Sequence, residues 1–168
     1  MWDGGAPRNL GGLPGGTWST ARGINEAGQV ILWGDNAFGE SRAALWYDDV
    51  VTDLGTFGGH NGWAYGLNNM GYVVGWAELA AGNYHAFVHN GIKMIDLGTL
   101  GGLFSSAYGI SDSGVIVGSA QTADNKWWAV QWDPVPEPSS LSGLLSCIVC
   151  VSIVWRHRQK RAVDRGQI

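Results

Sequence analysis

Asp-Leu-Gly-Thr-Leu-Gly-Gly, at residues 96–102, decides the fold because it recurs along the chain at a fixed distance. Residues 53–59 read Asp-Leu-Gly-Thr-Phe-Gly-Gly, 43 positions earlier. A weaker copy with one residue inserted, Asn-Leu-Gly-Gly-Leu-Pro-Gly-Gly, occupies residues 9–16. A repeat of this length indicates units that pack on one another, so it must be recognised before any local pattern is interpreted.

Other positions keep the same register of 43 residues. They are alanines, glycines and apolar residues, such as Ala21, Ala64 and Ala107; Gly28, Gly71 and Gly114; and Val30, Val73 and Ile116. A clear departure is Leu32, because the later repeats have Gly75 and Gly118 at that position. Three repeats therefore fill about residues 9–52, 53–95 and 96–133.

Each repeat is predicted to contain four short strands, which in the second repeat are residues 64–67, 72–76, 85–88 and 94–97. These runs are rich in Val, Ile, Phe, Tyr and Trp and are separated by turn residues. Tight turns are predicted at residues 25–28, 68–71 and 111–114. There the first side chain can bond the backbone ahead, and the closing glycine can adopt a positive φ. The glycine pairs, such as Gly58-Gly59, predict a second corner.

The fold class expected for residues 1–133 is all-β, with tandem four-stranded repeats arranged like the blades of a β-propeller. Four strands in about 43 residues is the usual size of a blade. Three blades are too few for an ordinary closed propeller, so we expect a fragment, a dimer or an open stack with exposed edges. Residues 1–8 resemble the end of a repeat and contain no recognisable signal peptide. Either they complete the last repeat, or an upstream part is missing.

The composition favours glycine turns and argues against long surface helices, with 27 Gly, 10 Trp and only 14% charged residues. Charge is divided along the chain. Residues 1–138 contain five basic and thirteen acidic residues, whereas residues 139–168 contain five basic residues and one acidic residue. The acidic body excludes nucleic acid as an expected partner, since that binding needs a basic surface. The basic tail indicates a separate role.

The last 35 residues differ from the repeats. Residues 134–140 are a proline-rich linker, because proline lacks the backbone donor that a strand needs. Residues 141–155 carry no charge and are predicted to form a transmembrane helix. As a helix, residues 139–155 would be about 25 Å long at ~1.5 Å per residue, slightly short of a ~30 Å hydrocarbon core. The basic residues 156–168 would stay in the cytoplasm with the repeats outside. The alternative is a buried hydrophobic helix.

The repeats resemble the bacterial extracellular repeats of the HAF family over about three quarters of the chain. The second repeat carries the resemblance best, with His-Ala-Phe at residues 85–87 followed by residues 96–102. The first and third repeats depart from the family at this motif, with Arg-Ala-Ala at residues 42–44 and Trp-Ala-Val at residues 128–130. These departures indicate that His85 is not a required functional group.

The carboxy-terminal region resembles the PEP-CTERM sorting signal. The three parts of that signal are present in order: a Pro-Glu-Pro motif, an apolar helix and a basic cluster. They are formed here by Val135, Pro136, Glu137 and Pro138, by residues 141–155, and by Arg156, Arg158, Lys160 and Arg161. The resemblance implies recognition in the inner membrane by an exosortase and cleavage near Pro-Glu-Pro. Delivery to the cell envelope or the exopolysaccharide matrix would follow. Family members also carry an amino-terminal signal peptide.

No catalytic residue, metal site or cofactor is predicted. The sequence contains no defensible Ser–His–Asp order, nucleophile elbow, phosphate loop or dinucleotide fingerprint. His60, His85 and His89 do not recur between repeats, and the acidic residues form no calcium loop. Asp53 and Asp96 more naturally anchor turns. Cys147 and Cys150, inside the apolar run, are expected to be inert, with acylation as an alternative.

Four tryptophans provide the one ligand hypothesis, because exposed indoles can stack on sugar rings. Those expected near loops or strand edges are Trp18, Trp63, Trp127 and Trp128, whereas those at shared repeat positions, Trp33, Trp76, Trp46 and Trp132, are expected in the core.

The sequence thus predicts a non-enzymatic protein of the bacterial cell envelope. Its partners would be the membrane, an exosortase-type enzyme and exopolysaccharide. A carbohydrate-binding, lectin-like propeller is the main alternative. A secreted glycoside-type hydrolase is the weaker one, since paired carboxylates are a three-dimensional feature.

Overall fold

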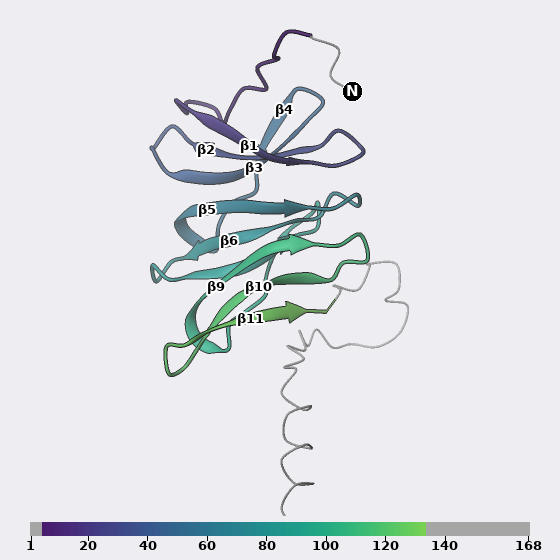
Figure 1. Cartoon of the computed structure of the whole chain (residues 1–168). Coiled ribbons are helices and arrows are strands. Elements are labelled where there is room, and N and C mark those ends of the chain that lie inside the picture. Colours follow the sequence, from purple (N-terminus) through teal and green to yellow (C-terminus); the bar gives the residue numbers. More distant parts are fainter. Residues whose placement is uncertain (1–4, 134–168) are drawn as a thin grey trace, which may run out of the picture.

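Eleven β-strands in three antiparallel sheets form the part of the chain that the computed structural model describes, residues 5–133 (Figure 1). The first sheet contains β1 (Ser19–Ile24), β2 (Val30–Asp35), β3 (Ser41–Tyr47) and β4 (Val50–Asp53). The second contains β5 (Gly58–Leu67), β6 (Val73–Leu79), β7 (Tyr84–His89) and β8 (Met94–Asp96). The third contains β9 (Gly101–Ile110), β10 (Ile116–Thr122) and β11 (Trp127–Trp132). The expected all-β fold is confirmed for these residues.

Each sheet is a simple meander in which sequential strands are neighbours. The predicted hairpin turns are confirmed: the N–H groups of Gln29, Tyr72 and Val115 donate to the side chains of Asn25, Asn68 and Ser111 (2.9–3.0 Å). The closing glycines of these turns have φ of 79°, 79° and 82°. Asp48 and Asp49, between β3 and β4, also have positive φ, as a two-residue hairpin turn of the mirror-image type requires.

The first strand of the second sheet is longer than predicted. It begins at Gly58, in the glycine pair that we expected to form only a corner. Gly58 does turn the chain, with φ of 95°. Gly59 continues as strand, and a Cβ atom there would lie 2.7 Å from the carbonyl oxygen of Leu79. The missing side chain therefore lets β5 run close beside the end of β6.

The sheets pack face to face, and the hydrophobic core lies in the two seams between them. The first seam is built around Ile31, Ala64, Val73 and Phe87. The second is built around Val74, Val88, Ala107, Ile116 and Trp132. The repeated heptapeptide links one sheet to the next, and its leucines, Leu54 and Leu97, are buried in the seams.

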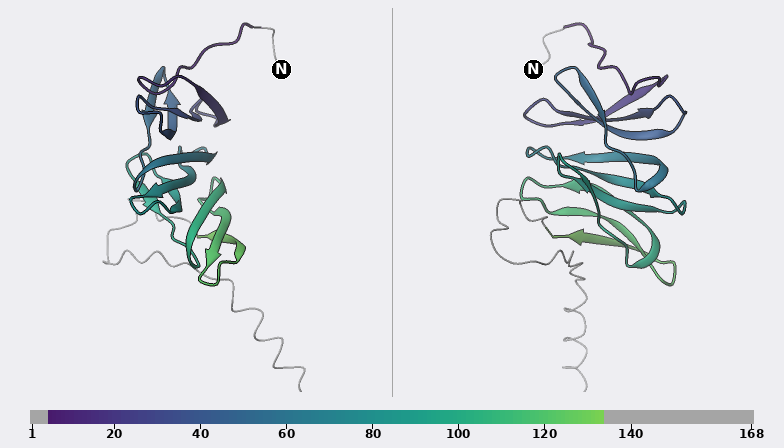
Figure 2. Two further views of the ribbon diagram at one scale, coloured as in Figure 1. Left: turned by 90° about the vertical axis from the view of Figure 1, so that its left-hand side faces the viewer. Right: turned by 180° about the vertical axis from the view of Figure 1, so that it is seen from behind.

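The two ends of the stack differ. Residues 5–16 lie on the outer side of the first sheet, where Leu13 packs on Leu32 and Ala44. Among residues 5–133 the third sheet has three strands, with β11 at its edge. The first and third sheets lie at opposite ends, with the second between them (Figures 1 and 2). In the described part, the amino-terminal segment does not supply a fourth strand to the third sheet.

No helix of residues 5–133 is long and apolar enough to span a membrane. The predicted linker, transmembrane helix and basic tail, residues 134–168, lie outside the described residues, as do Cys147 and Cys150.

Candidate functional site

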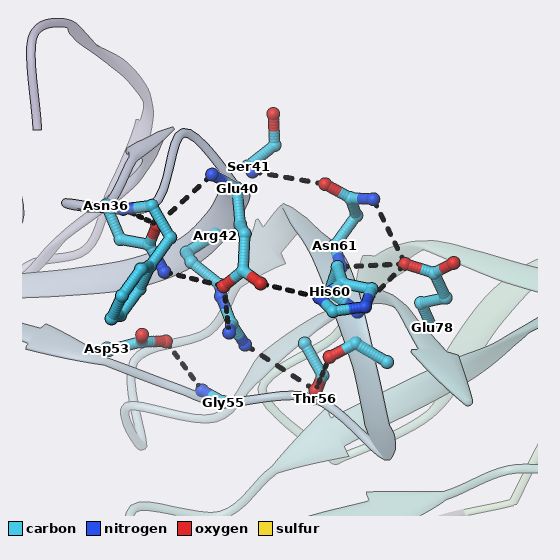
Figure 3. Close-up of polar contacts among 12 residues, drawn as sticks. Asn36, Glu40, Ser41, Arg42, Asp53, Gly55, Thr56, His60, Asn61 and Glu78 are labelled. Carbon is cyan, nitrogen blue, oxygen red and sulfur yellow. Dashed lines mark hydrogen bonds and ion pairs between the residues drawn. The ribbon is translucent and has the colours of Figure 1, made fainter. Parts of the chain in front are cut away.

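A polar cluster joins the first and second sheets, with the carboxylate of Glu40 at its centre (Figure 3). Glu40 Oε2 accepts hydrogen bonds from the side chains of Asn36 (2.8 Å) and Arg42 (2.6 Å). Its Oε1 atom contacts Nδ1 of His60, on β5, at 2.5 Å. Beside this contact, the N–H of Ser41 donates to Oδ1 of Asn61 (3.1 Å). The cluster therefore fixes the start of β3 against the start of β5.

A second carboxylate, Glu78 on β6, binds the bulged start of β5. Its Oε2 atom accepts the N–H of His60 (3.0 Å) and both the N–H (2.9 Å) and the side-chain amide (3.0 Å) of Asn61. The register of β5 on β6 shifts between Gly58 and Gly62, so these N–H groups fall at an interruption of the ladder. A bulge leaves such donors without a strand partner, and Glu78 supplies the acceptor.

The same contact recurs 43 residues away in both directions. In the first sheet, Asp35 accepts the N–H groups of Thr17 (2.7 Å) and Trp18 (2.8 Å). In the third sheet, Oε1 of Gln121 accepts the N–H of Leu103 (3.1 Å). This position was not predicted from the sequence, because the three repeats have Asp, Glu and Gln there. Its polarity in all three repeats was the available signal.

Both carboxylates of the cluster are held ionised. Hydrogen bonds from Asn36, His60 and Arg42 lower the pKa of Glu40 to about 2. Burial opposes ionisation of Glu78, but the N–H groups of His60 and Asn61 outweigh it and lower the pKa of that carboxyl. A glycosidase general acid needs a raised pKa. Glu40 and Glu78 are therefore suited to holding the sheets in place, not to donating a proton.

The conformation of the repeated heptapeptide, at residues 53–59 and 96–102, is explained by local hydrogen bonds. The side chains of Asp53 and Asp96 accept the N–H groups two residues ahead (2.8 and 2.7 Å), and the hydroxyl groups of Thr56 and Thr99 donate to carbonyls three residues ahead (2.7 and 2.8 Å). This confirms that Asp53 and Asp96 anchor turns.

An aromatic row crosses the three sheets. It runs from Trp18 through Trp33 and Trp63 to Trp76, Tyr84 and Phe104, with successive ring centroids 3.9–5.9 Å apart. A branch leads through Tyr65 to Tyr108, whose centroids are 5.5 Å apart. The guanidinium of Arg22 lies 4.5 Å from the ring centroid of Trp33. Such tilted and edge-on pairs stabilise neighbouring sheets beyond the burial of their area.

The structure divides the four tryptophans of the ligand hypothesis into two pairs. Trp18 and Trp63 belong to the aromatic row, with Trp18 45% exposed and Nε1 of Trp63 buried without a hydrogen-bond partner. Trp127 and Trp128 lie on β11 and are 45% and 58% exposed. Of the four tryptophans expected in the core, Trp132 is buried, whereas Trp33, Trp46 and Trp76 are half-buried.

The histidines gather no metal site in residues 5–133, where no group of three potential metal ligands is found. His85 pairs through Nδ1 with Asp96 (2.8 Å), and burial lowers the pKa of His89. His60 is bound to Glu40. These side chains make separate contacts and do not converge.

The resemblances to HAF repeats and to the PEP-CTERM signal depend on the residues quoted for them. Comparisons of the chain with protein-family models, with curated proteins and with solved structures found no match. Both resemblances therefore stay predictions.

Proposed function

We propose that this chain is an exported, non-catalytic β-repeat protein of the bacterial cell envelope, sorted through its carboxy-terminal segment. The observation that carries this proposal is the order of three sequence features. Pro-Glu-Pro at residues 136–138 precedes the uncharged residues 141–155, and a basic cluster follows at residues 156–161. Positive charge directly after an apolar helix orients it with the charge in the cytoplasm. The repeats would then face outward.

The partners of this function are the inner membrane and an exosortase-type enzyme that cleaves near Pro-Glu-Pro. Residues 141–155 form the transmembrane helix until cleavage, and the repeats form propeller-like blades. The described side chains support a structural role for the body, because the repeated Asp35, Glu78 and Gln121 bind backbone groups within their own sheets.

The basic cluster provides the test. Replacing Arg156, Arg158, Lys160 and Arg161 by glutamine removes the orienting charge, whereas Arg165→Gln, four residues beyond the cluster, is the matched control. In the producing cells, the cluster variant should lose the accessibility of its repeats to external protease, and the control should keep it. Equal accessibility of the two variants would contradict the proposed sorting.

A second candidate function, binding of exopolysaccharide, is favoured by exposed rings that are connected to the aromatic row. Tyr108 is 53% exposed and Trp18 is 45% exposed, and each contacts a further aromatic ring behind it. Arg22 adds a charge beside Trp33. Neutral and acidic oligosaccharides should change the tryptophan fluorescence of the full chain. Tyr108→Ala should weaken that response and Phe38→Ala, at an exposed turn, should not. A response that is identical in both variants would exclude the row as the site.

A further inference from the structure

The third sheet lacks, among residues 5–133, the strand that completes each of the other two. In the first sheet β4 pairs with β3, and in the second sheet β8 pairs with β7. The equivalent side of β11 faces no strand of the described chain. We propose that residues 6–10 of a second copy pair with β11, and that two copies joined reciprocally in this way form a closed ring of six sheets.

Residues 6–10 align with the fourth strands of the first and second sheets. Asn9 and Leu10 align with Asp53-Leu54 and with Asp96-Leu97. The local geometry agrees, because Oδ1 of Asn9 accepts the N–H of Gly11 (2.9 Å) as the two aspartates accept theirs. Yet residues 6–10 belong to no strand, and residues 6–9 are exposed. We call residues 6–10 the arm.

Proline in the arm falls where a strand tolerates it. Across β7 and β8, the N–H of Leu97 donates to the carbonyl oxygen of Ala86 (2.9 Å). Hydrogen-bonded and non-hydrogen-bonded pairs alternate along an antiparallel ladder, so Ile95 also occupies a hydrogen-bonded position and Met94 does not. Pro7 aligns with Met94. Its missing N–H group is therefore not needed for pairing with β11.

The residues that follow β11 in the same chain have a proline at a position that must donate a hydrogen bond. In the register of 43 residues, Pro138 stands at the position of Ile95, which must donate a hydrogen bond. Proline has no N–H to donate. The arm places Arg8 at this position, and Arg8 has the required donor. The arm is thus the better complement for β11.

Both ends of the stack expose apolar positions that the seams bury elsewhere. Val117 is 48% exposed, although its repeat equivalents Ile31 and Val74 are 0% exposed. At the other end, Ile24 is 70% exposed, although its equivalent Leu67 packs on the core of the first seam. The outer face of the third sheet therefore carries the apolar position that the first and second sheets bury in the seams. The outer face of the first sheet carries the position that packs against it from the neighbouring sheet.

The exposed tryptophans also match across such a junction. Tyr84 of the second sheet stacks on Phe104 of the third, with centroids 4.8 Å apart. The equivalent pair across the junction is Trp127 of one copy and Trp18 of the other, and each of these is 45% exposed in the single chain. A junction built like the second seam would bring these two rings into contact.

The number of copies follows from the size of closed propellers. The arm and β11 lie at opposite ends of one stack, so a single copy does not bring them together (Figure 2). Head-to-tail contacts between copies make either closed rings or open filaments. Two copies supply six sheets, within the range of about four to eight blades found in closed propellers.

A cysteine pair tests the pairing in the purified full chain in detergent. Arg8→Cys and Gln131→Cys align with Ile95 and Val88, which are direct partners in the second sheet. Such partners lie about 5.5 Å apart at Cα, which suits a disulfide. In a Cys147→Ser, Cys150→Ser background, mild oxidation should give a disulfide-linked dimer and no larger species. Arg8→Cys with Asp124→Cys, in an exposed turn, is the mismatched control and should give none.

A second variant tests the contact between the third sheet of one copy and the first sheet of the other, independently of the arm. Val117→Lys places a charge on the outer face of the third sheet, whereas Phe38→Lys changes a residue that is 86% exposed in a turn. By native mass spectrometry, the wild-type chain and Phe38→Lys should be dimers, and Val117→Lys should have half that mass. Monomeric wild type, a disulfide within one chain, or a ladder of larger disulfide-linked species would overturn the six-sheet ring.

Discussion

Asp35, Glu78 and Gln121 share one repeat position and differ in length and charge, yet each accepts at least one backbone N–H at or near the start of the first strand of its own sheet. The acceptor is what the position needs, because Thr17 and Trp18 precede β1, and the partners of Glu78 and Gln121 lie at register shifts of the ladder. A single residue type therefore does not mark the position. At the residue scale, the repeat preserves hydrogen-bonding capacity more strictly than identity.

Glu40 makes stability depend on pH. Its folded-state pKa of about 2 lies below the ordinary value of 4.5, so its contribution is present above pH 4.5 and is lost as the pH falls toward 2. The melting temperature of the wild-type chain should fall over this interval, and Glu40→Gln should make the fall shallower. Glu26→Gln is the control, since Glu26 contacts Asn69 through its backbone N–H. Parallel melting curves for Glu40→Gln and wild type would contradict the role of this carboxylate.

Gly75 marks a close approach of two strands. A Cβ atom there would lie 1.8 Å from the carbonyl oxygen of Trp63. Gly75→Ala should lower the free energy of unfolding by about 1–3 kcal/mol, because overpacking forces the backbone apart. At Gly62 a Cβ would approach no atom more closely than 3.5 Å. Gly62→Ala should be neutral or stabilising by up to about 1 kcal/mol. Urea unfolding measures both, and equal effects would refute the steric explanation.

At the scale of elements, the hairpin turns form a ladder from sheet to sheet. The side-chain amide of Asn25 donates to the carbonyl oxygen of Asn68, and that of Asn68 donates to Ser111 (both 3.1 Å). The side chains of Asn25 and Asn68 therefore stabilise their own hairpins through Oδ1 and contact the next sheet through Nδ2.

Asn68→Asp separates these two roles. The carboxylate keeps the acceptor for Tyr72 but cannot donate to Ser111, so this buried position should lose about 1–3 kcal/mol of unfolding free energy. Asn90→Asp is the matched control, because the Asn90 side chain accepts N–H groups of Ile92 and Lys93 within its own turn. Urea unfolding should leave the control within about 0.5 kcal/mol of wild type. A similar loss of unfolding free energy in both variants would show that the ladder does not stabilise the contact between sheets.

The features predictable from the sequence are those that repeat in identity. The turns at Asn25 and Asn68, and the linkers around Asp53 and Asp96, follow from residue types whose local hydrogen bonds are known. The aromatic row could not be predicted, because its contacts join rings at different repeat positions: Trp33 lies on β2 and Trp63 on β5. Sequence spacing does not show which rings meet across a seam. The ladder joins equivalent positions 43 residues apart, but spacing alone does not show that neighbouring turns lie within hydrogen-bond distance.

At the scale of the whole molecule, the body and the tail have separate properties. The described sheets form an acidic stack with its core in the seams. The tail carries a Pro-Glu-Pro motif, an uncharged stretch and a basic cluster. Removal of the tail after export would release the body from the membrane without touching residues 5–133. One measurement of the intact mass therefore tests whether the tail has been removed from the body.

The intact mass of the protein recovered from the native cell envelope tests the proposed sorting most directly. Processing near Pro-Glu-Pro predicts a species that ends at about Pro138 and has lost the apolar and basic segments. The matched control is the same measurement on a Pro136→Ala, Glu137→Gln, Pro138→Ala variant, which should keep its tail. A wild-type species that retains residues 156–168 would contradict processing and would indicate a permanent membrane anchor.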